Sequence, residues 1–223
     1  MACLLYCVTK SDVEPVRIAA GVCDEPVHLQ EAPGLRIYWS EIADPETTLA
    51  QSAARKSAES KFQQVLHEIV VHVTPVPFSF PLVLSDLDAV EKYITEQCQF
   101  FCQALIRLAD TVQYEMIASW TADEQADLAT PVSGREYAKR RQEAAGRIAA
   151  IDTKLKTVTG DTVREWRARQ DRRKHHWFAL VPRENRDRFI AALRSAGPSE
   201  GLRLRLSGPW PPSEFVSPQN ASR

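Results

Sequence analysis

The chain has 223 residues, of which 44% are apolar and 26% are charged, an ordinary composition for a globular protein. This length is sufficient for one large domain or two small ones. No run approaches the roughly 18 consecutive apolar residues of a membrane-spanning helix, and the N-terminus lacks the basic region of a signal peptide. We therefore expect a cytoplasmic protein that does not enter a membrane.

The charges are distributed unevenly along the chain. Residues 1–124 contain 8 Lys and Arg against 18 Asp and Glu, a net charge of −10. Residues 125–223 contain 20 against 11, a net charge of +9. Opposite charges on the two halves predict two domains that attract each other or attract neighbouring copies of the chain.

The first half contains alternating strand and helix patterns. Short strands are predicted near 4–9, 27–29 and 35–39, followed by a helix whose apolar stripe begins at Phe62. Pro77 and Pro81 restrict the next apolar run to an edge strand or a bulged strand. Asp86 and Asp88 fit the start of a second helix over 87–108, and residues 111–120 alternate as a strand. We expect residues 1–122 to form an α+β domain related to the ferredoxin-like arrangement.

The second half is predicted to form another α+β domain, over residues 132–223, after a polar linker over 121–131. A long helix begins at Ser133, and the pattern predicts that helical structure continues to Lys174. A strand over 177–181, a short helix over 184–196 and an alternating strand at 202–206 follow. The segment Gly208-Pro209-Trp210-Pro211-Pro212 then ends the strand, because proline fixes φ and lacks a backbone donor. We expect Trp210 to be buried against this second domain.

The sequence predicts no metal, cofactor or catalytic site. Cys98 and Cys102 lie four residues apart in a helical pattern, which is compatible with half a zinc site, but inert thiols in the core are the preferred interpretation. His67 and His72 are five residues apart, whereas a helical zinc protease motif needs four. No glycine-rich phosphate loop and no nucleophile elbow occurs, so we expect a protein that is not an enzyme.

The basic segment 164–177 is the best candidate for nucleic-acid binding, because it mixes arginines with Trp166 and Trp177. Acidic residues at Asp161, Glu165 and Asp171 interrupt it, so a solvated or partner-docking face is preferred.

Several stretches resemble the gas vesicle GvpF/GvpL family. The most specific are Ser133-Gly134-Arg135-Glu136-Tyr137, which matches the family's S-G-R-x-Y helix start, and its C-terminal ending. That ending, G-P-W-P-P-x-x-F-V, corresponds here to Gly208, Pro209, Trp210, Pro211, Pro212, Phe215 and Val216. Weaker matches surround Glu25-Pro26-Val27 and Val65-Leu66-His67-Glu68. The chain departs from the family pattern at Ser79 and Pro81, where Arg and Gly are usual.

The resemblance implies a modified ferredoxin-like N-terminal domain and a C-terminal α+β domain with a long helix. It implies a non-enzymatic, minor structural or assembly component of gas vesicles. The implied partners are a small hydrophobic shell protein of the GvpA kind and other gas vesicle accessory proteins. The alternative function is a ferredoxin-like adaptor module, with possible nucleic-acid binding through 164–177.

Overall fold

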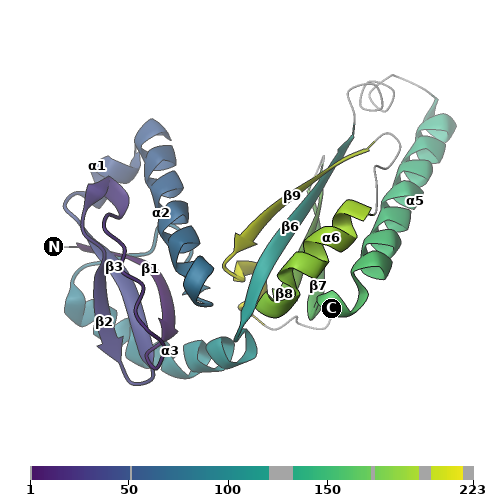
Figure 1. The fold of residues 1–223 in the computed structure, drawn as a ribbon. Coiled ribbons are helices and arrows are strands. Elements are labelled where there is room, and N and C mark those ends of the chain that lie inside the picture. The colour runs from purple at the N-terminus through teal and green to yellow at the C-terminus, as the bar shows by residue number, and fades with distance from the viewer. Residues whose placement is uncertain (1, 51, 121–132, 172–173, 196–201, 218–223) are drawn as a thin grey trace. The chain divides into compact units, whose positions relative to one another are not determined.

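The computed structural model describes residues 2–50, 52–120, 133–171, 174–195 and 202–217. The chain divides into two compact units (Figure 1). Unit 1 contains residues 1–112 and 209–223, and unit 2 contains residues 113–208. The chain therefore leaves unit 1 after its last helix and returns to it for the tail. The linker predicted at 121–131 lies outside the described residues.

Unit 1 is built on an antiparallel sheet. Its strands are β1 (Ala2–Lys10), β2 (His28–Ala32), β3 (Leu35–Ile42), β4 (Val76–Pro77) and β5 (Val83–Leu84). The order is β2-β3-β1-β4, and β5 also pairs with β1. The central strand β1 is almost fully buried. It reads as a continuous apolar run because both of its faces are covered.

The helices of unit 1 follow the apolar patterns of the sequence. They are α1 (Pro45–Ala50), α2 (Ser52–His72) and α3 (Leu87–Arg107). Phe62, Val65 and Ile69 of α2 are buried in one cluster with Leu4 and Tyr6 of β1. Asp86 caps α3 by accepting a 2.8 Å hydrogen bond from the Ala89 N–H, which confirms the predicted helix start. Among the described residues, no helix is long and apolar enough to cross a membrane.

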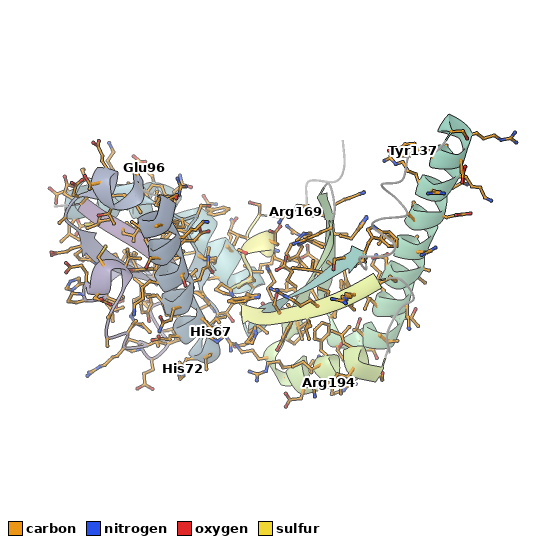
Figure 2. The ribbon with its side chains drawn as sticks, turned by 90° about the horizontal axis from the view of Figure 1, so that it is seen from above. His67, His72, Glu96, Tyr137, Arg169 and Arg194 are labelled. Atoms are coloured by element: carbon orange, nitrogen blue, oxygen red, sulfur yellow. The ribbon has the colours of Figure 1, made fainter. Side chains whose placement is uncertain are left out.

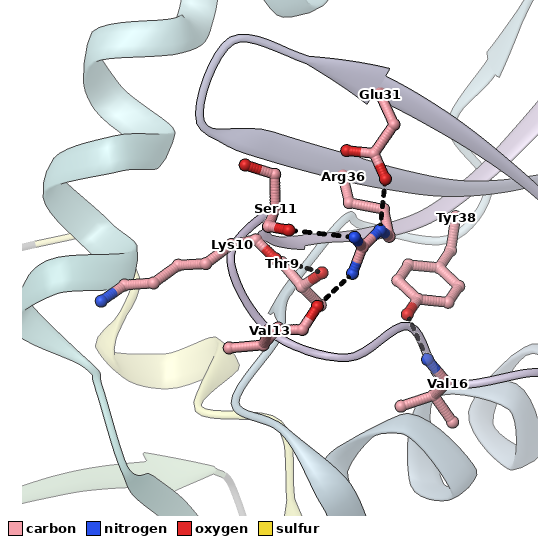
Figure 3. Close-up of polar contacts among 8 residues, drawn as sticks. All are labelled: Thr9, Lys10, Ser11, Val13, Val16, Glu31, Arg36 and Tyr38. Atoms are coloured by element: carbon pink, nitrogen blue, oxygen red, sulfur yellow. Dashed lines mark hydrogen bonds and ion pairs between the residues drawn. The ribbon is translucent and has the colours of Figure 1, made fainter.

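Unit 1 differs from a complete β-α-β-β-α-β arrangement in its first connection. Between β1 and β2, the described structure contains only the short 3₁₀ helix Val22–Asp24. The buried guanidinium of Arg36 holds this connection in place (Figure 3). It donates hydrogen bonds to the Val13 carbonyl at 2.7 Å and the Ser11 carbonyl at 3.0 Å, and its Nε pairs with Glu31 at 2.6 Å. The Val16 N–H donates to the Tyr38 hydroxyl at 3.0 Å, so the backbone groups of the loop find partners without a helix.

Unit 2 contains four strands and two helices. They are β6 (Thr111–Trp120), α5 (Gly134–Thr159), β7 (Glu165–Asp171), β8 (Lys174–Pro182), α6 (Arg186–Ser195) and β9 (Leu202–Trp210). The strand order is β7-β8-β6-β9 (Figure 1). The sequence predicted that residues 111–120 belong to the first sheet, but β6 pairs in the second one. Unit 2 therefore has the element order β-α-β-β-α-β, whereas the order predicted for the first half was strand, strand, helix, strand, helix, strand.

The basic segment after α5 is a strand and not the predicted continuation of the helix. Gly160 ends α5 with φ of +33°, a conformation that favours glycine. Residues 165–171 then form an antiparallel hairpin with β8, in which Trp166 lies opposite Ala179 and Arg167 opposite Phe178. The alternation of Trp166 and Ala168 with Arg167 and Arg169 is a period-two pattern, and the density of charge in this segment concealed it.

The C-terminal tail packs on unit 1, which corrects the prediction that Trp210 is buried against the second domain. The Trp210 ring is half-buried and lies 5.7 Å from the His67 ring of α2. Phe215 is completely buried. Arg107 of α3 donates to the carbonyl oxygens of Phe215 and Val216, the latter at 2.9 Å. Gly208, Pro209 and Trp210 still belong to β9, which corrects the prediction that the strand ends before them, and Pro211 and Pro212 then lead the chain onto α2 and α3.

Candidate partner-binding groove

The long helix α5 is packed along only part of its length. Ser133 begins it, accepting a 3.4 Å hydrogen bond from the Glu136 N–H, as the family motif predicted. The buried residues of α5 all lie in its second half and are Ile151, Leu155 and Thr159. Residues 133–150 are exposed except for half-buried Arg140, Ala144 and Ile148. A solvent-facing first half leaves an amphipathic helix with one side uncovered.

A groove of about 680 Å³ lies beside the first half of α5 within unit 2. Its other wall is one end of the sheet, where β6 and β7 end and β8 begins. Aromatic and small side chains dominate the lining, with two cations and one carboxylate among the polar groups. The lining residues are Trp120, Tyr137, Arg141, Ala144, Ala145, Ile148, Ala149, Asp152, Lys156, Ala168, Gln170, His175 and Trp177.

A hydrogen bond ties α5 to the sheet at the inner end of this groove. The Trp177 Nε1–H donates to the Asp152 carboxylate at 3.0 Å, and the Lys156 ammonium lies 2.8 Å from the same carboxylate group. Trp177 is only 2% exposed, so its N–H needs a partner within the protein. The Asp152 carboxylate is therefore already engaged by two donors.

The outer part of the groove is aromatic and cationic. Tyr137 lies on α5 and is 51% exposed (Figure 2). The Arg141 guanidinium lies 5.9 Å from the centre of the Tyr137 ring. The Arg147 guanidinium lies at the same distance from the Trp120 ring. Burial lowers the pKa of His175, and the neighbouring charge of His176 lowers it further. A lowered pKa favours the neutral form of His175, so the cations among the described lining residues are Arg141 and Lys156.

The other face of the hairpin carries a different set of charges. Arg167 pairs with Glu165 at 2.7 Å, and His176 contacts Glu115 at 2.7 Å. The Arg169 guanidinium lies 5.3 Å from the Phe178 ring centre. Trp166 and Trp177 lie on the opposite face in the hairpin register, with Trp177 directed at α5. Among the described residues, Arg167 and Arg169 therefore lie on the opposite face of the hairpin from Trp166 and Trp177, and these four side chains do not form one base-stacking surface.

The two family motifs belong to different units. Ser133, Gly134, Arg135 and Tyr137 begin α5, and of these only Tyr137 lines the groove. Gly208 belongs to unit 2, whereas Pro209 to Val216 belong to unit 1.

Sequence patterns did not identify the groove, because its lining comes from four elements that are distant along the chain. The repeat of Tyr137, Arg141, Ala144 and Ile148 along α5 was the one visible signal.

The cysteines of α3 lie close to each other, four residues apart along the helix. The Sγ atoms of Cys98 and Cys102 lie 3.9 Å apart, and both residues are half-buried, so the prediction that they lie in the core is wrong. Within the described ranges, no group of three or more His, Cys, Asp or Glu side chains is placed to hold a metal ion.

A smaller hollow of about 220 Å³ in unit 1 lies between Thr9, His72 and Asp110.

Comparison with known proteins identifies the family. No curated relative matches the chain. The fold is similar to the crystal structure of the gas vesicle protein GvpF from Anabaena sp. PCC7120, with a TM-score of 0.74 and 18% identity over 97% of this chain and 96% of that one. It is also similar to GvpF from Microcystis aeruginosa, with a TM-score of 0.73 and 18% identity over 97% and 99% of the two chains. The family model for gas vesicle synthesis protein GvpL/GvpF matches residues 2–217, and the chain therefore belongs to the GvpL/GvpF family.

Proposed function

We propose that this protein is a non-enzymatic assembly component of gas vesicles that binds the small hydrophobic shell subunit. The observation that carries the proposal is the family match over residues 2–217, which includes both units and the tail. A subunit that polymerises through apolar surfaces exposes them before assembly, and a binding partner prevents their premature aggregation. The first half of α5 and its groove offer a surface of aromatic, small apolar and polar side chains for such contacts.

The charge of the two units supports contacts with several partners. Unit 1 has 9 Lys and Arg against 16 Asp and Glu, a net charge of −7. Unit 2 has 19 against 13, a net charge of +6. Surfaces of opposite sign on one molecule attract partners of both signs and accelerate their association. We extend the proposal to other gas vesicle accessory proteins on this basis, and to a location at the growing vesicle.

Two experiments test the proposed function. In the first, the chain replaces the GvpF/GvpL gene of a recombinant gas vesicle cluster, and we expect buoyant cells and vesicles visible by electron microscopy. In the second, tagged protein is co-expressed with a shell subunit, and we expect the two to co-purify. Failure of both experiments with a folded protein would overturn the proposal.

A further inference from the structure

We infer that the groove beside α5 is the docking site for an amphipathic helix with an apolar stripe and acidic flanking residues. This inference deepens the proposed function and rests on it where the helix is assigned to the shell subunit. The groove lining runs along α5 from Tyr137 to Lys156. At 1.5 Å per residue this distance is about 28 Å, which suits an elongated element such as a helix better than a compact ligand.

The side chains of α5 allow another backbone to approach closely. Ala144, Ala145 and Ala149 line the groove, and Gly146 has open space around its Cα. Small residues on one helix face let a second helix lie at a short interaxial distance. Tyr137 and Trp120 supply exposed or half-exposed aromatic area at the open end, and aromatic side chains often dominate binding energy at interfaces. The apolar stripe of the docked helix would contact these residues and Ile148.

The charges of the groove favour a docked helix that has acidic residues beside its apolar stripe. The lining contains Arg141, Lys156 and Asp152, and Asp152 already accepts from Trp177 and pairs with Lys156. Arg141 lies beside Tyr137 on an exposed turn of α5, where its guanidinium can also meet a carboxylate. Unit 2 as a whole is positive, with a net charge of +6. A helix with Glu or Asp beside its apolar stripe is complementary to this surface, and one with Lys is repelled.

The test uses the full chain and two synthetic helical peptides with the same leucine stripe. One peptide has Glu flanks and the other has Lys flanks. We expect the Glu peptide to bind, to change the tryptophan emission through Trp120 and Trp177, and to bind more weakly as salt increases. We expect the Lys peptide to bind at least about tenfold more weakly, a difference of about 1.4 kcal/mol.

Substitutions in the groove and matched controls locate the binding site. Arg141→Glu and the groove-filling Ala145→Trp should each weaken binding of the Glu peptide about tenfold or more. Lys154→Glu makes the same charge change on α5 outside the groove and should retain binding. The inference is overturned if neither peptide binds, if both bind equally, or if Lys154→Glu weakens binding as much as Arg141→Glu. It is also overturned if the wild-type chain self-associates and Arg141→Glu abolishes that association, because a second copy would then fill the groove.

Co-purification with the shell subunit separates this inference from the proposed function. If wild type and Arg141→Glu both retain the shell subunit, the proposed function stands and the docking site is wrong. If the Glu peptide binds and the shell subunit does not, the groove accepts such a helix and the proposed function is wrong. We expect the wild type to retain the shell subunit and both groove variants to lose it.

Discussion

Phe215→Ala is the substitution that best tests where the C-terminal tail packs. The Phe215 side chain has no exposed surface, and its backbone carbonyl accepts a hydrogen bond from Arg107 of α3. Truncation of a buried phenylalanine removes its burial energy and leaves a cavity, at a cost of about 3–5 kcal/mol. For a unit of this size, each kcal/mol corresponds to a shift of roughly 3–5 °C, so the melting temperature of unit 1 should fall by roughly 10–20 °C.

Calorimetry gives the size of this effect, and hydrogen exchange gives its location. We expect amide protection to fall in α2 and α3, where His67 and Arg107 contact the tail, and to persist in the sheet of unit 2. Ser213→Ala is the matched control, because Ser213 lies in the same 3₁₀ turn and its side chain is exposed. This substitution should leave the melting temperature unchanged. If protection falls in β6 and β9 and persists in α3, the tail packs on unit 2 and the structural assignment is refuted.

Three further predictions concern backbone geometry, ionisation and helix packing. Gly208→Ala should destabilise unit 2 by about 1–3 kcal/mol in urea unfolding, because the φ of Gly208 is +130° and an added Cβ would lie 2.8 Å from the Gln113 carbonyl oxygen. The control is Gly146→Ala in an exposed turn of α5, where an added Cβ meets no atom within 4 Å, and it should stabilise unit 2 by about 0.5–1 kcal/mol. Burial raises the pKa of Cys7 well above its usual 9.0 and raises the pKa of Tyr6 and Tyr38 above 10.0, so these groups keep their protons in the native state while the unfolded chain loses them. The free energy of unfolding should therefore be highest below pH 9 and fall as the pH rises further. The urea midpoint should be lower at pH 10 than at pH 7.5, and Cys7→Ala should reduce this difference between the two midpoints. Equal midpoints at the two pH values would contradict the prediction. Asp152→Ala should cost about 1–2 kcal/mol by leaving the Trp177 N–H without its acceptor, and a red shift in tryptophan emission should accompany the loss.

Local signals in the sequence predicted the elements whose determinants lie close together along the chain. The stripe from Phe62 to Val70 identified α2, and the capping pattern at 85–88 identified the start of α3, where the structure has Asp86 as the capping residue. The Ser133 cap began α5 as the family motif indicated. Caps and helical stripes depend on neighbours within about four residues, which is why they can be read without tertiary structure.

Pairing between distant strands could not be read in the same way. Residues 111–120 have a clear strand pattern, but nothing in that pattern states whether their partners precede or follow them. The sequence predicts a helix over residues 164–174 because the six basic residues of this segment conceal the alternation of Trp166 and Ala168 with Arg167 and Arg169. The groove has the same difficulty, because Trp120, Tyr137 and Trp177 belong to separate elements and meet only after the sheet has formed.

The position of the tail changes how the two units are related along the chain. Gly208 lies against Gln113 and Tyr114, so the chain enters and leaves unit 2 at neighbouring points. Unit 2 is therefore an insertion between α3 and the tail of unit 1, a connection that is tolerated where the ends of the inserted unit are close. Arg107 and Phe215 are 108 residues apart, and their contact forms only after all of unit 2 has been synthesised. The family's C-terminal motif thus completes the N-terminal unit, and a truncation after β9 would remove part of the core of unit 1 and leave the described core of unit 2 intact.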